Sequence, residues 1–264
     1  MLLEIKNLEI SYGTKVTVSD ANLELEKGEI LSIVGESGSG KTTIIRAAMG
    51  CLPGAGRVSA GSITYNGIDV LQNTKKQWRE MSGTEMSMIF QDSGNMINPI
   101  RKIGVQFIDY IRTHAPEKSV DEAYKMATDM LTNVRLPSPD NIMNSYPFEL
   151  SGGMRQRVGI AIAMVFQPKI LMADEPTSAL DVTTQAQIIR QIIDVRDQFG
   201  VAVIIVTHNL GVASYMSDKI MVMKSGRPVD YGYRDEVLKN PKSDYTKGLL
   251  KAVPVIGGVP YYGQ

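Results

Sequence analysis

The sequence predicts an α/β fold that includes an antiparallel β subdomain and an inserted α-helical subdomain. Three apolar runs of strand length, at 29–34, 169–173 and 201–206, each lead into glycine or polar residues. Buried strands of open α/β sheets have this form, because ligands bind at the carboxyl ends of such strands. A long stretch that favours helix lies between the first run and the second. We expect one domain, with a core of 1–91 and 166–232, a helical subdomain of 92–165 and a C-terminal tail of 233–264.

The first part of the chain favours β-structure. Residues 2–10 and 16–25 alternate apolar and polar side chains, as half-solvated antiparallel strands do, and 61–65 has the composition of another strand. The buried run 29–34 leads into a glycine-rich loop, and we expect a helix from Lys41 to Met49 after that loop.

The insert favours helices with a clear start signal. Ser119 and Glu122 have the spacing of a capping box, in which each side chain accepts a hydrogen bond from the other residue's backbone N–H. Apolar residues follow at helical spacing: Val120, Ala123, Ala127, Met130, Leu131 and Val134. Pro137 and Pro139 are expected to end this helix. The 15 methionines lie mainly in apolar stretches, so we interpret them as core residues rather than as metal ligands.

Composition and charge exclude several classes of protein. The 264 residues can bury a substantial core, and 28 Lys and Arg balance 28 Asp and Glu. A nucleic-acid-binding domain usually has a pI above about 9, whereas the pI here is about 6.8. Charged residues interrupt the apolar N-terminus, and the longest apolar run, Val158–Phe166, is about half of a membrane span. Because Cys51 is the only cysteine, no internal disulfide can form, and we expect a cytosolic protein.

Residues 35–42 have the sequence GESGSGKT, a phosphate-binding loop placed between a predicted strand and a predicted helix. Glycines let backbone N–H groups surround a phosphate, and the helix N-terminus adds a positive dipole end. Lys41 supplies a point charge to the β- and γ-phosphates, and the Thr42 hydroxyl is a ligand for Mg²⁺. The loop predicts a nucleoside triphosphate, but kinases, GTPases and motors all share it.

Other polar residues follow the buried strands. Asp174 and Glu175 follow the run 169–173, and in a strand their side chains would point to opposite faces. One carboxylate could then reach Mg²⁺ through water while the other polarises the attacking water. His208 follows 201–206 in the same way, and we interpret it as a γ-phosphate contact.

A second anion-binding helix start is predicted at LSGGMRQR, residues 150–157. The chain has only one complete phosphate-binding loop. The second helix start is therefore expected to serve a nucleotide bound to a partner subunit, although SGG could also be an ordinary helix cap.

The order GESGSGKT, Gln91, LSGGM, ILMADEPTSALD and His208 resembles the ATP-binding subunits of ABC transporters over essentially the whole chain. This resemblance implies a P-loop NTPase cassette with a RecA-like core. It assigns residues 35–42 as Walker A, Gln91 as the Q-loop residue, 151–154 as the signature and 178–181 as the D-loop. The implied cofactors are ATP and Mg²⁺.

The resemblance also implies roles for individual residues. Glu175 is the catalytic base, with His208 as the switch histidine and Gln91 as the γ-phosphate sensor. Mg²⁺ is held by Thr42, Gln91 and Asp174. Tyr12 matches the aromatic residue that stacks on adenine, although stacking tolerates every base. The implied nucleotide contacts are Tyr12, Gly35, Glu36, Ser37, Gly38, Ser39, Gly40, Lys41, Thr42, Thr43, Ser151, Gly152, Gly153, Met154 and Asp181.

Finer features resemble the uptake branch for peptides, opines and nickel. They include IFQD followed by INP, SGGMRQRV, and the tail NPKSDYTKGLLKAVP. Three residues depart from the common pattern: Ser93 in the Q-loop, Met154 in the signature, and Pro228 in a segment usually rich in β-branched residues. Met154 is frequent in this branch, so it does not count against activity.

The implied partners are two transmembrane permease subunits, a second ATP-binding subunit that is either a paralogue or a second copy, and indirectly an extracytoplasmic solute-binding protein. We expect the chain at the cytoplasmic face of the membrane, with Gln91–Ile100 meeting the permease, and no nucleic acid. An exporter motor or a non-transport ABC protein is the alternative. Chromosome-organising relatives need a coiled-coil insertion, and residues 42–174 have no sustained heptad.

Overall fold

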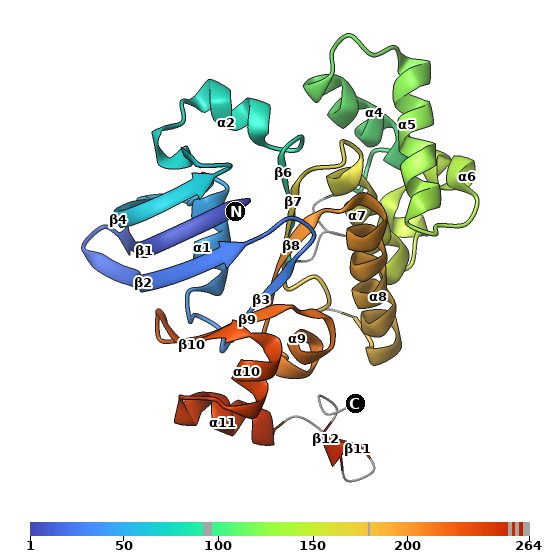
Figure 1. Cartoon of the computed structure of the whole chain (residues 1–264). Helices are drawn as coiled ribbons and strands as arrows, with labels where there is room; N and C mark the ends of the chain where they lie inside the picture. The colour runs from blue at the N-terminus through green and yellow to red at the C-terminus, as the bar shows by residue number, and fades with distance from the viewer. Residues whose placement is uncertain (92–96, 179, 253–254, 257–258, 261–264) are drawn as a thin grey trace. The chain divides into compact units, whose positions relative to one another are not determined.

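The computed structural model describes residues 1–91, 97–178, 180–252, 255–256 and 259–260. The chain forms two compact units (Figure 1). The first unit contains residues 1–79 and 202–264, and the second contains residues 80–201.

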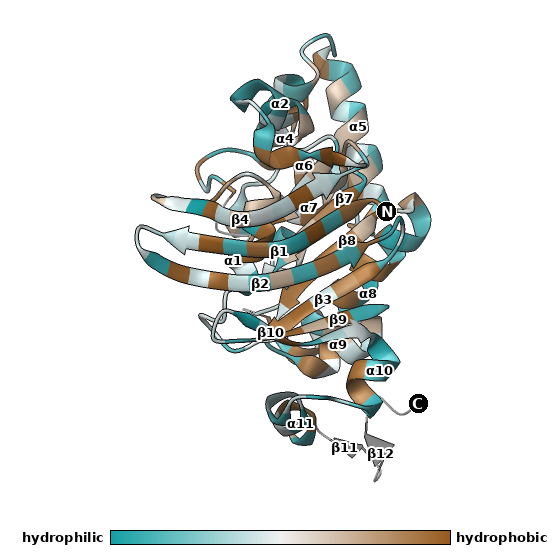
Figure 2. Ribbon diagram, turned by 60° about the vertical axis from the view of Figure 1, so that its left-hand side comes forward, coloured by the Kyte–Doolittle hydropathy of each residue, from teal (hydrophilic) through white to brown (hydrophobic). Residues whose placement is uncertain are grey.

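One sheet of the first unit is antiparallel, with the strand order β2-β1-β4-β5. Its strands are β1 (Leu3–Tyr12), β2 (Lys15–Leu25), β4 (Gly56–Tyr65) and β5 (Ile68–Asp69). Leu3 lies opposite Leu25 on one side and Tyr65 on the other. Apolar and polar bands alternate along β1 and β2 (Figure 2), as the sequence predicts for strands with one buried face.

The first unit also contains further strands of a sheet, which lie side by side in the order β10-β9-β3-β8. These strands are β3 (Ile30–Gly35), β8 (Ala202–Thr207), β9 (Lys219–Lys224) and β10 (Arg227–Tyr233). β3 runs parallel to both β8 and β9, and β10 is antiparallel to β9. Every residue of β3 and β8 is buried, which fits their continuous apolar sequences.

Pro228 stands in β10, the terminal strand of this order, where it pairs with Met223. The ladder register shifts between Pro228 and Asp230. Proline lacks a backbone N–H, so within sheets it is confined to edge strands and bulges. The strand therefore accommodates the residue that departs from the usual β-branched pattern.

Helices and short turns complete the first unit. They are α1 (Lys41–Ala48), η1 (Val70–Gln72), α9 (Leu210–Met216), α10 (Arg234–Lys239) and α11 (Asp244–Lys251), while α2 (Lys75–Met81) crosses its boundary. Val237 and Leu238 of α10 and Leu250 of α11 join one core cluster with Val34 and Val222. The stretch expected as a tail is thus part of the core as far as α11. β11 (Val255–Ile256) and β12 (Val259–Pro260) pair with each other.

The second unit contains two parallel strands, β6 (Met86–Ile89) and β7 (Ile170–Asp174). Most of the insert is helical, as predicted. Its elements are α4 (Ile103–His114), α5 (Val120–Asn133), α6 (Pro139–Asn144), η2 (Pro147–Glu149) and α7 (Gly152–Met164), and they are followed by α8 (Val182–Phe199).

The capping box at the start of α5 is confirmed. Ser119 Oγ accepts from Glu122 N at 3.2 Å, and Glu122 Oε2 accepts from Ser119 N at 2.9 Å. Ala123, Ala127, Met130 and Leu131 are buried.

Two details of this helix differ from the prediction. Val120 is 51% exposed, whereas Ala123 in the same turn of α5 is buried. Arg135, with φ 57°, turns the chain out of the helix before either proline, and Pro139 instead begins α6 at a position where its missing N–H costs nothing.

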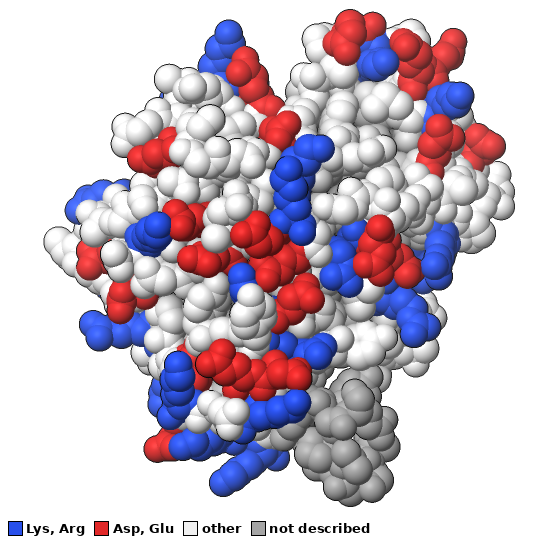
Figure 3. Space-filling model, viewed as in Figure 1, with Lys and Arg blue, Asp and Glu red and all other residues white. Residues whose placement is uncertain are grey.

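The surface and composition agree with a balanced charge. Basic and acidic side chains are interspersed over the face drawn in Figure 3. Within the described residues, no helix combines the length and the apolar character needed to cross a membrane. Cys51 is exposed and not part of a disulfide.

Candidate nucleotide-binding site

The predicted phosphate-binding loop connects β3 to α1, with Gly35 ending the strand and Lys41 beginning the helix. A Cβ atom on Gly35 would lie 2.2 Å from the carbonyl oxygen of Met223, so only glycine fits beside β9. Gly38 (φ 77°) and Gly40 (φ 96°) have left-handed backbones that side chains rarely adopt. The glycines of the motif are therefore required by packing and by backbone conformation.

The polar groups of this loop fit a phosphate ligand. Lys41 is buried, and its Nζ donates to the carbonyl oxygens of Gly35 and Glu36, both at 2.8 Å. Ser39 is 3% exposed, and its Oγ has no hydrogen-bond partner among the residues that the structure describes. Buried hydroxyls nearly always have a partner, so this atom indicates a ligand oxygen.

The outer part of the loop is open to solvent. Glu36, Ser37 and Gly38 are exposed, and Thr42 and Thr43 at the first turn of α1 are half-buried. A Cβ atom on Gly38 would meet nothing within 4 Å. The loop is therefore accessible to a nucleotide from this side.

Tyr12 is the last residue of β1, and its half-buried ring packs against the backbone of Gly56 in β4. A Cβ atom on Gly56 would lie 2.8 Å from Tyr12 Cε1. The absence of a side chain at this position lets the ring lie close to the β4 backbone, which restricts its motion. A ring held in this way can serve as a stacking surface.

His208 follows the end of β8 and is exposed. The residues on both sides of it are fixed. Thr207 Oγ1 accepts from Asn209 N at 3.0 Å, and Asn209 Oδ1 caps α9 by accepting from Gly211 N at 2.8 Å. The strand and the helix cap thus hold the histidine backbone in place.

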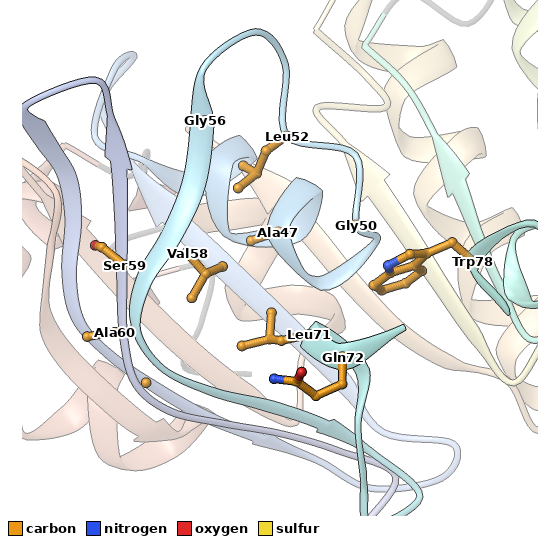
Figure 4. A pocket seen from close by; sticks show the side chains of 11 residues that line it. Ala47, Gly50, Leu52, Gly56, Val58, Ser59, Ala60, Leu71, Gln72 and Trp78 are labelled. Carbon is orange, nitrogen blue, oxygen red and sulfur yellow. The ribbon is translucent and has the colours of Figure 1, made fainter. Parts of the chain in front are cut away.

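A cavity of about 470 Å³ in the first unit lies next to the C-terminal end of α1. Leu52, Val58 and Leu71 point toward it, and Trp78 lies beside Gly50 (Figure 4). None of the residues that line it is among the predicted nucleotide contacts, so this cavity is not the predicted site.

The second unit carries the acidic pair. Asp174 ends β7 and is 2% exposed, while Glu175 is half-buried. The strand has already ended at Glu175, whose φ is 44°. The side-chain alternation that we used to separate the two carboxylates therefore does not apply, and a left-handed backbone redirects Glu175 instead. Such non-glycine conformations are concentrated at functional sites.

The predicted signature begins α7, as expected for a helix start. Ser151 is the N-cap, and its Oγ accepts from Met154 N at 3.3 Å. A Cβ atom on Gly153 would lie 2.9 Å from Thr184 Cγ2, whereas one on Gly152 would make only an ordinary contact, at 3.6 Å from Leu180. Gly153 is therefore the glycine that packing requires.

Asp181 caps α8 and is linked to the signature through Thr184. Its Oδ2 accepts from Thr184 Oγ1 at 2.6 Å, and its Oδ1 accepts from Thr184 N at 3.0 Å. These hydrogen bonds lower the pKa of the exposed Asp181 carboxyl. We did not single out Thr184 from the sequence, although the Asp-x-x-Thr spacing of an N-cap could have identified it.

Gln91 is exposed in a turn that follows β6. Residues 92–96, which include Ser93, Asn95 and Met96 of the expected permease contact, lie outside the described residues, as does Ala179 of the D-loop. The first unit thus carries Tyr12, Gly35–Thr43 and His208. The second carries Gln91, Ser151–Met154, Asp174, Glu175 and Asp181.

The chain belongs to the ABC transporter family, which it matches over residues 18–178. It is therefore an ATP-hydrolysing cassette, and the predicted fold class is confirmed.

Its relatives include peptide-transport subunits. It is 42% identical to the oligopeptide transport ATP-binding protein OppD of Salmonella typhimurium, over 96% of this chain and 76% of that protein. It is 38% identical to the dipeptide transport ATP-binding protein DppD of Lactococcus lactis, over 97% of this chain and 74% of that one. The predicted relationship to the peptide branch is confirmed.

Solved structures show the same fold. The ATP-binding cassette MJ0796, described as a dimer in a post-hydrolysis state bound to ADP and Pi, superposes with a TM-score of 0.76 and 26% identity. That match covers 88% of this chain and 99% of the cassette. CbiO1 from Clostridium perfringens, part of the ABC transporter complex cbiONQ, has a TM-score of 0.77 and 25% identity, over 96% and 94% of the two chains.

Proposed function

We propose that this chain is the motor subunit of an ABC importer that couples ATP binding and hydrolysis to the uptake of di- or oligopeptides through a membrane permease. The observation that carries the proposal is a complete set of ATPase motifs in a chain whose relatives are named as peptide-transport subunits. Opines and nickel are the other cargoes that the sequence pattern allows, and the names of these relatives favour peptides.

We assign ATP binding to the loop Gly35–Thr43 and adenine stacking to Tyr12. The buried Ser39 hydroxyl and the Lys41 ammonium support phosphate binding. Thr42, Gln91 and Asp174 would hold Mg²⁺, because hydroxyl, amide and carboxylate oxygens form the all-oxygen ligand set that this ion prefers. When bound, the ion neutralises charge on the phosphates.

Glu175 is the proposed base that polarises the attacking water, and His208 and Gln91 are the proposed γ-phosphate contacts. Ser151–Met154 would close over the ATP of a second subunit, because the α7 N-terminus offers backbone N–H groups and a positive dipole end. Asp181 would act in the same closure. ATP would then hold two cassettes together, and hydrolysis would release them.

The proposed assembly contains two permease subunits, a second cassette that is a paralogue or a second copy, and a solute-binding protein on the other side of the membrane. The chain would lie at the cytoplasmic face. The proposed domain division is 1–91 and 166–232 for the core, 92–165 for the helical subdomain and 233–264 for a C-terminal segment, whose helices α10 and α11 pack on the core. Co-purification from the native membrane tests these partners, and recovery of a solute-binding protein distinguishes an importer from an exporter.

The Glu175→Gln variant tests the catalytic assignment. It removes the base but keeps the size of the side chain, so we expect ATP binding to persist while turnover falls by about 10²-fold or more. Lys41→Ala is the control for the binding loop, and it should lose ATP binding in an equilibrium titration with labelled ATP. Hydrolysis by Glu175→Gln at the parent rate would show that Glu175 is not the base.

A further inference from the structure

The C-terminal helix α11 reaches the phosphate-binding loop. The backbone N–H of Glu36 donates to the hydroxyl of Tyr245 at 3.2 Å, across 209 residues of sequence. The carbonyl of the same peptide unit, that of Gly35, accepts from Lys41 Nζ at 2.8 Å. One peptide plane therefore joins the Tyr245 hydroxyl on its N–H side to the Lys41 ammonium on its carbonyl side.

The Tyr245 ring is held from several directions. It packs against the core cluster that contains Val34, the residue before the loop. Lys224 Nζ lies 4.9 Å from the ring centroid, within the range of a cation–π contact. Burial raises the pKa of the Tyr245 hydroxyl. The hydroxyl is therefore protonated at neutral pH.

The start of α11 is anchored by a buried carboxylate. Asp230 is 6% exposed, and its two oxygens accept from Lys242 N at 2.8 Å and Ser243 N at 3.1 Å. The hydroxyl of the fully buried Thr246 also donates to Asp230. Since Thr246 follows Tyr245 directly, this network fixes the residue that contacts the loop.

The turn between β9 and β10 supports the same loop from another side. Gly226 N donates to Ser39 O at 3.1 Å, and its own carbonyl accepts from Ser19 N in β2 at 2.9 Å. The loop backbone is thus held at Glu36 by α11 and at Ser39 by this turn. Only the first of these contacts depends on a side chain, so it can be removed by one conservative substitution.

We propose that Tyr245 is a positioning residue for ATP binding, which holds the Gly35–Glu36 peptide and through it presents Lys41 to the phosphates. The inference rests on the proposed role of Gly35–Thr43 as the phosphate-binding loop. An ordered loop pays less conformational entropy when ATP binds, and this difference appears in affinity rather than in the chemical step.

The test uses the full chain with Tyr245→Phe, which removes the hydroxyl and keeps the ring. The matched control is Tyr231→Phe, since the Tyr231 hydroxyl likewise accepts from a backbone N–H, that of Glu24, at 2.9 Å in the same unit. We expect Tyr245→Phe to weaken ATP binding by about 2- to 12-fold, the range of one hydrogen bond, with an unchanged kcat at saturating ATP. Tyr231→Phe should bind ATP as the parent does.

Thermal unfolding of both variants establishes that they are folded at the temperature of the titration. Parent-like ATP affinity in Tyr245→Phe, or an equal loss in Tyr231→Phe, overturns the inference. Lys41→Ala distinguishes a wrong role for Tyr245 from a wrong assignment of the phosphate-binding loop. If Lys41→Ala loses ATP binding while Tyr245→Phe does not, the site stands and only the role of Tyr245 is wrong; retained binding in Lys41→Ala contradicts both.

Discussion

Thr184 shows how one side chain supports two motifs. Its hydroxyl donates to Asp181. Its methyl carbon would lie only 2.9 Å from a Cβ atom added to Gly153. The hydrogen bonds to Asp181 fix the Thr184 rotamer, so the methyl group cannot move aside easily. The start of the signature helix and the cap of α8 are therefore packed as a single arrangement within the second unit.

We predict that Gly153→Ala is destabilising and that Thr184→Ser rescues it. The added methyl group overpacks against Thr184, at a cost of about 1–3 kcal/mol in the free energy of unfolding. Thr184→Ser keeps the hydroxyl and removes the opposing methyl. Urea unfolding of the parent, both single variants and the double variant should give a favourable coupling energy of at least about 0.5 kcal/mol. Additive effects would contradict the contact.

Elements with a local signal were predictable from the sequence. The capping box at Ser119 and the strand–loop–helix around Lys41 depend on neighbours within a few residues, and both are found where the pattern predicts. Long-range contacts carry no such signal. The hydrogen bond from Glu36 to Tyr245 joins residues 209 positions apart. The positive φ of Glu175 occurs at the residue directly after β7 ends. Sequence patterns therefore predicted the motifs but not what holds them.

At α5, Ser119→Ala should lower the free energy of unfolding by about 0.5–2 kcal/mol, because the N3 backbone N–H loses its acceptor. ATP affinity should stay at the parent value, because Ser119 is not among the proposed nucleotide contacts. Chemical denaturation and an ATP titration measure the two effects. Ser119→Asp, which retains a capping oxygen, is the control, and a loss of stability equal to that of Ser119→Ala would contradict the cap.

For the whole molecule, the pH dependence of stability arises from groups whose pKa differs between the folded and the unfolded chain. His114, at the end of α4, is one of them. Its ring lies 4.9 Å from the Tyr110 ring and 5.6 Å from the Phe166 ring, and burial lowers its pKa from 6.5. The folded chain therefore favours neutral His114.

Stability should consequently decrease as the pH falls below about 6.5. In that range the unfolded chain binds a proton at His114 more readily than the folded chain does. No stability is lost above the pKa of His114 in the unfolded chain, and the loss is complete below the pKa of His114 in the folded chain. His114→Gln, which does not titrate there, should unfold with a weaker pH dependence between about pH 5 and 7. Equal pH slopes in the two proteins would exclude a contribution from His114.

Pro228 has a consequence for association between chains. An edge strand offers unpaired N–H and C=O groups that can template a strand from another molecule, which leads to aggregation. β10 is an edge strand. Pro228 has no backbone N–H, and the register shifts next to it, so the row of hydrogen-bond donors that such a template needs is interrupted. Pro228 thereby makes one non-specific mode of self-association, strand pairing along the edge of β10, unfavourable.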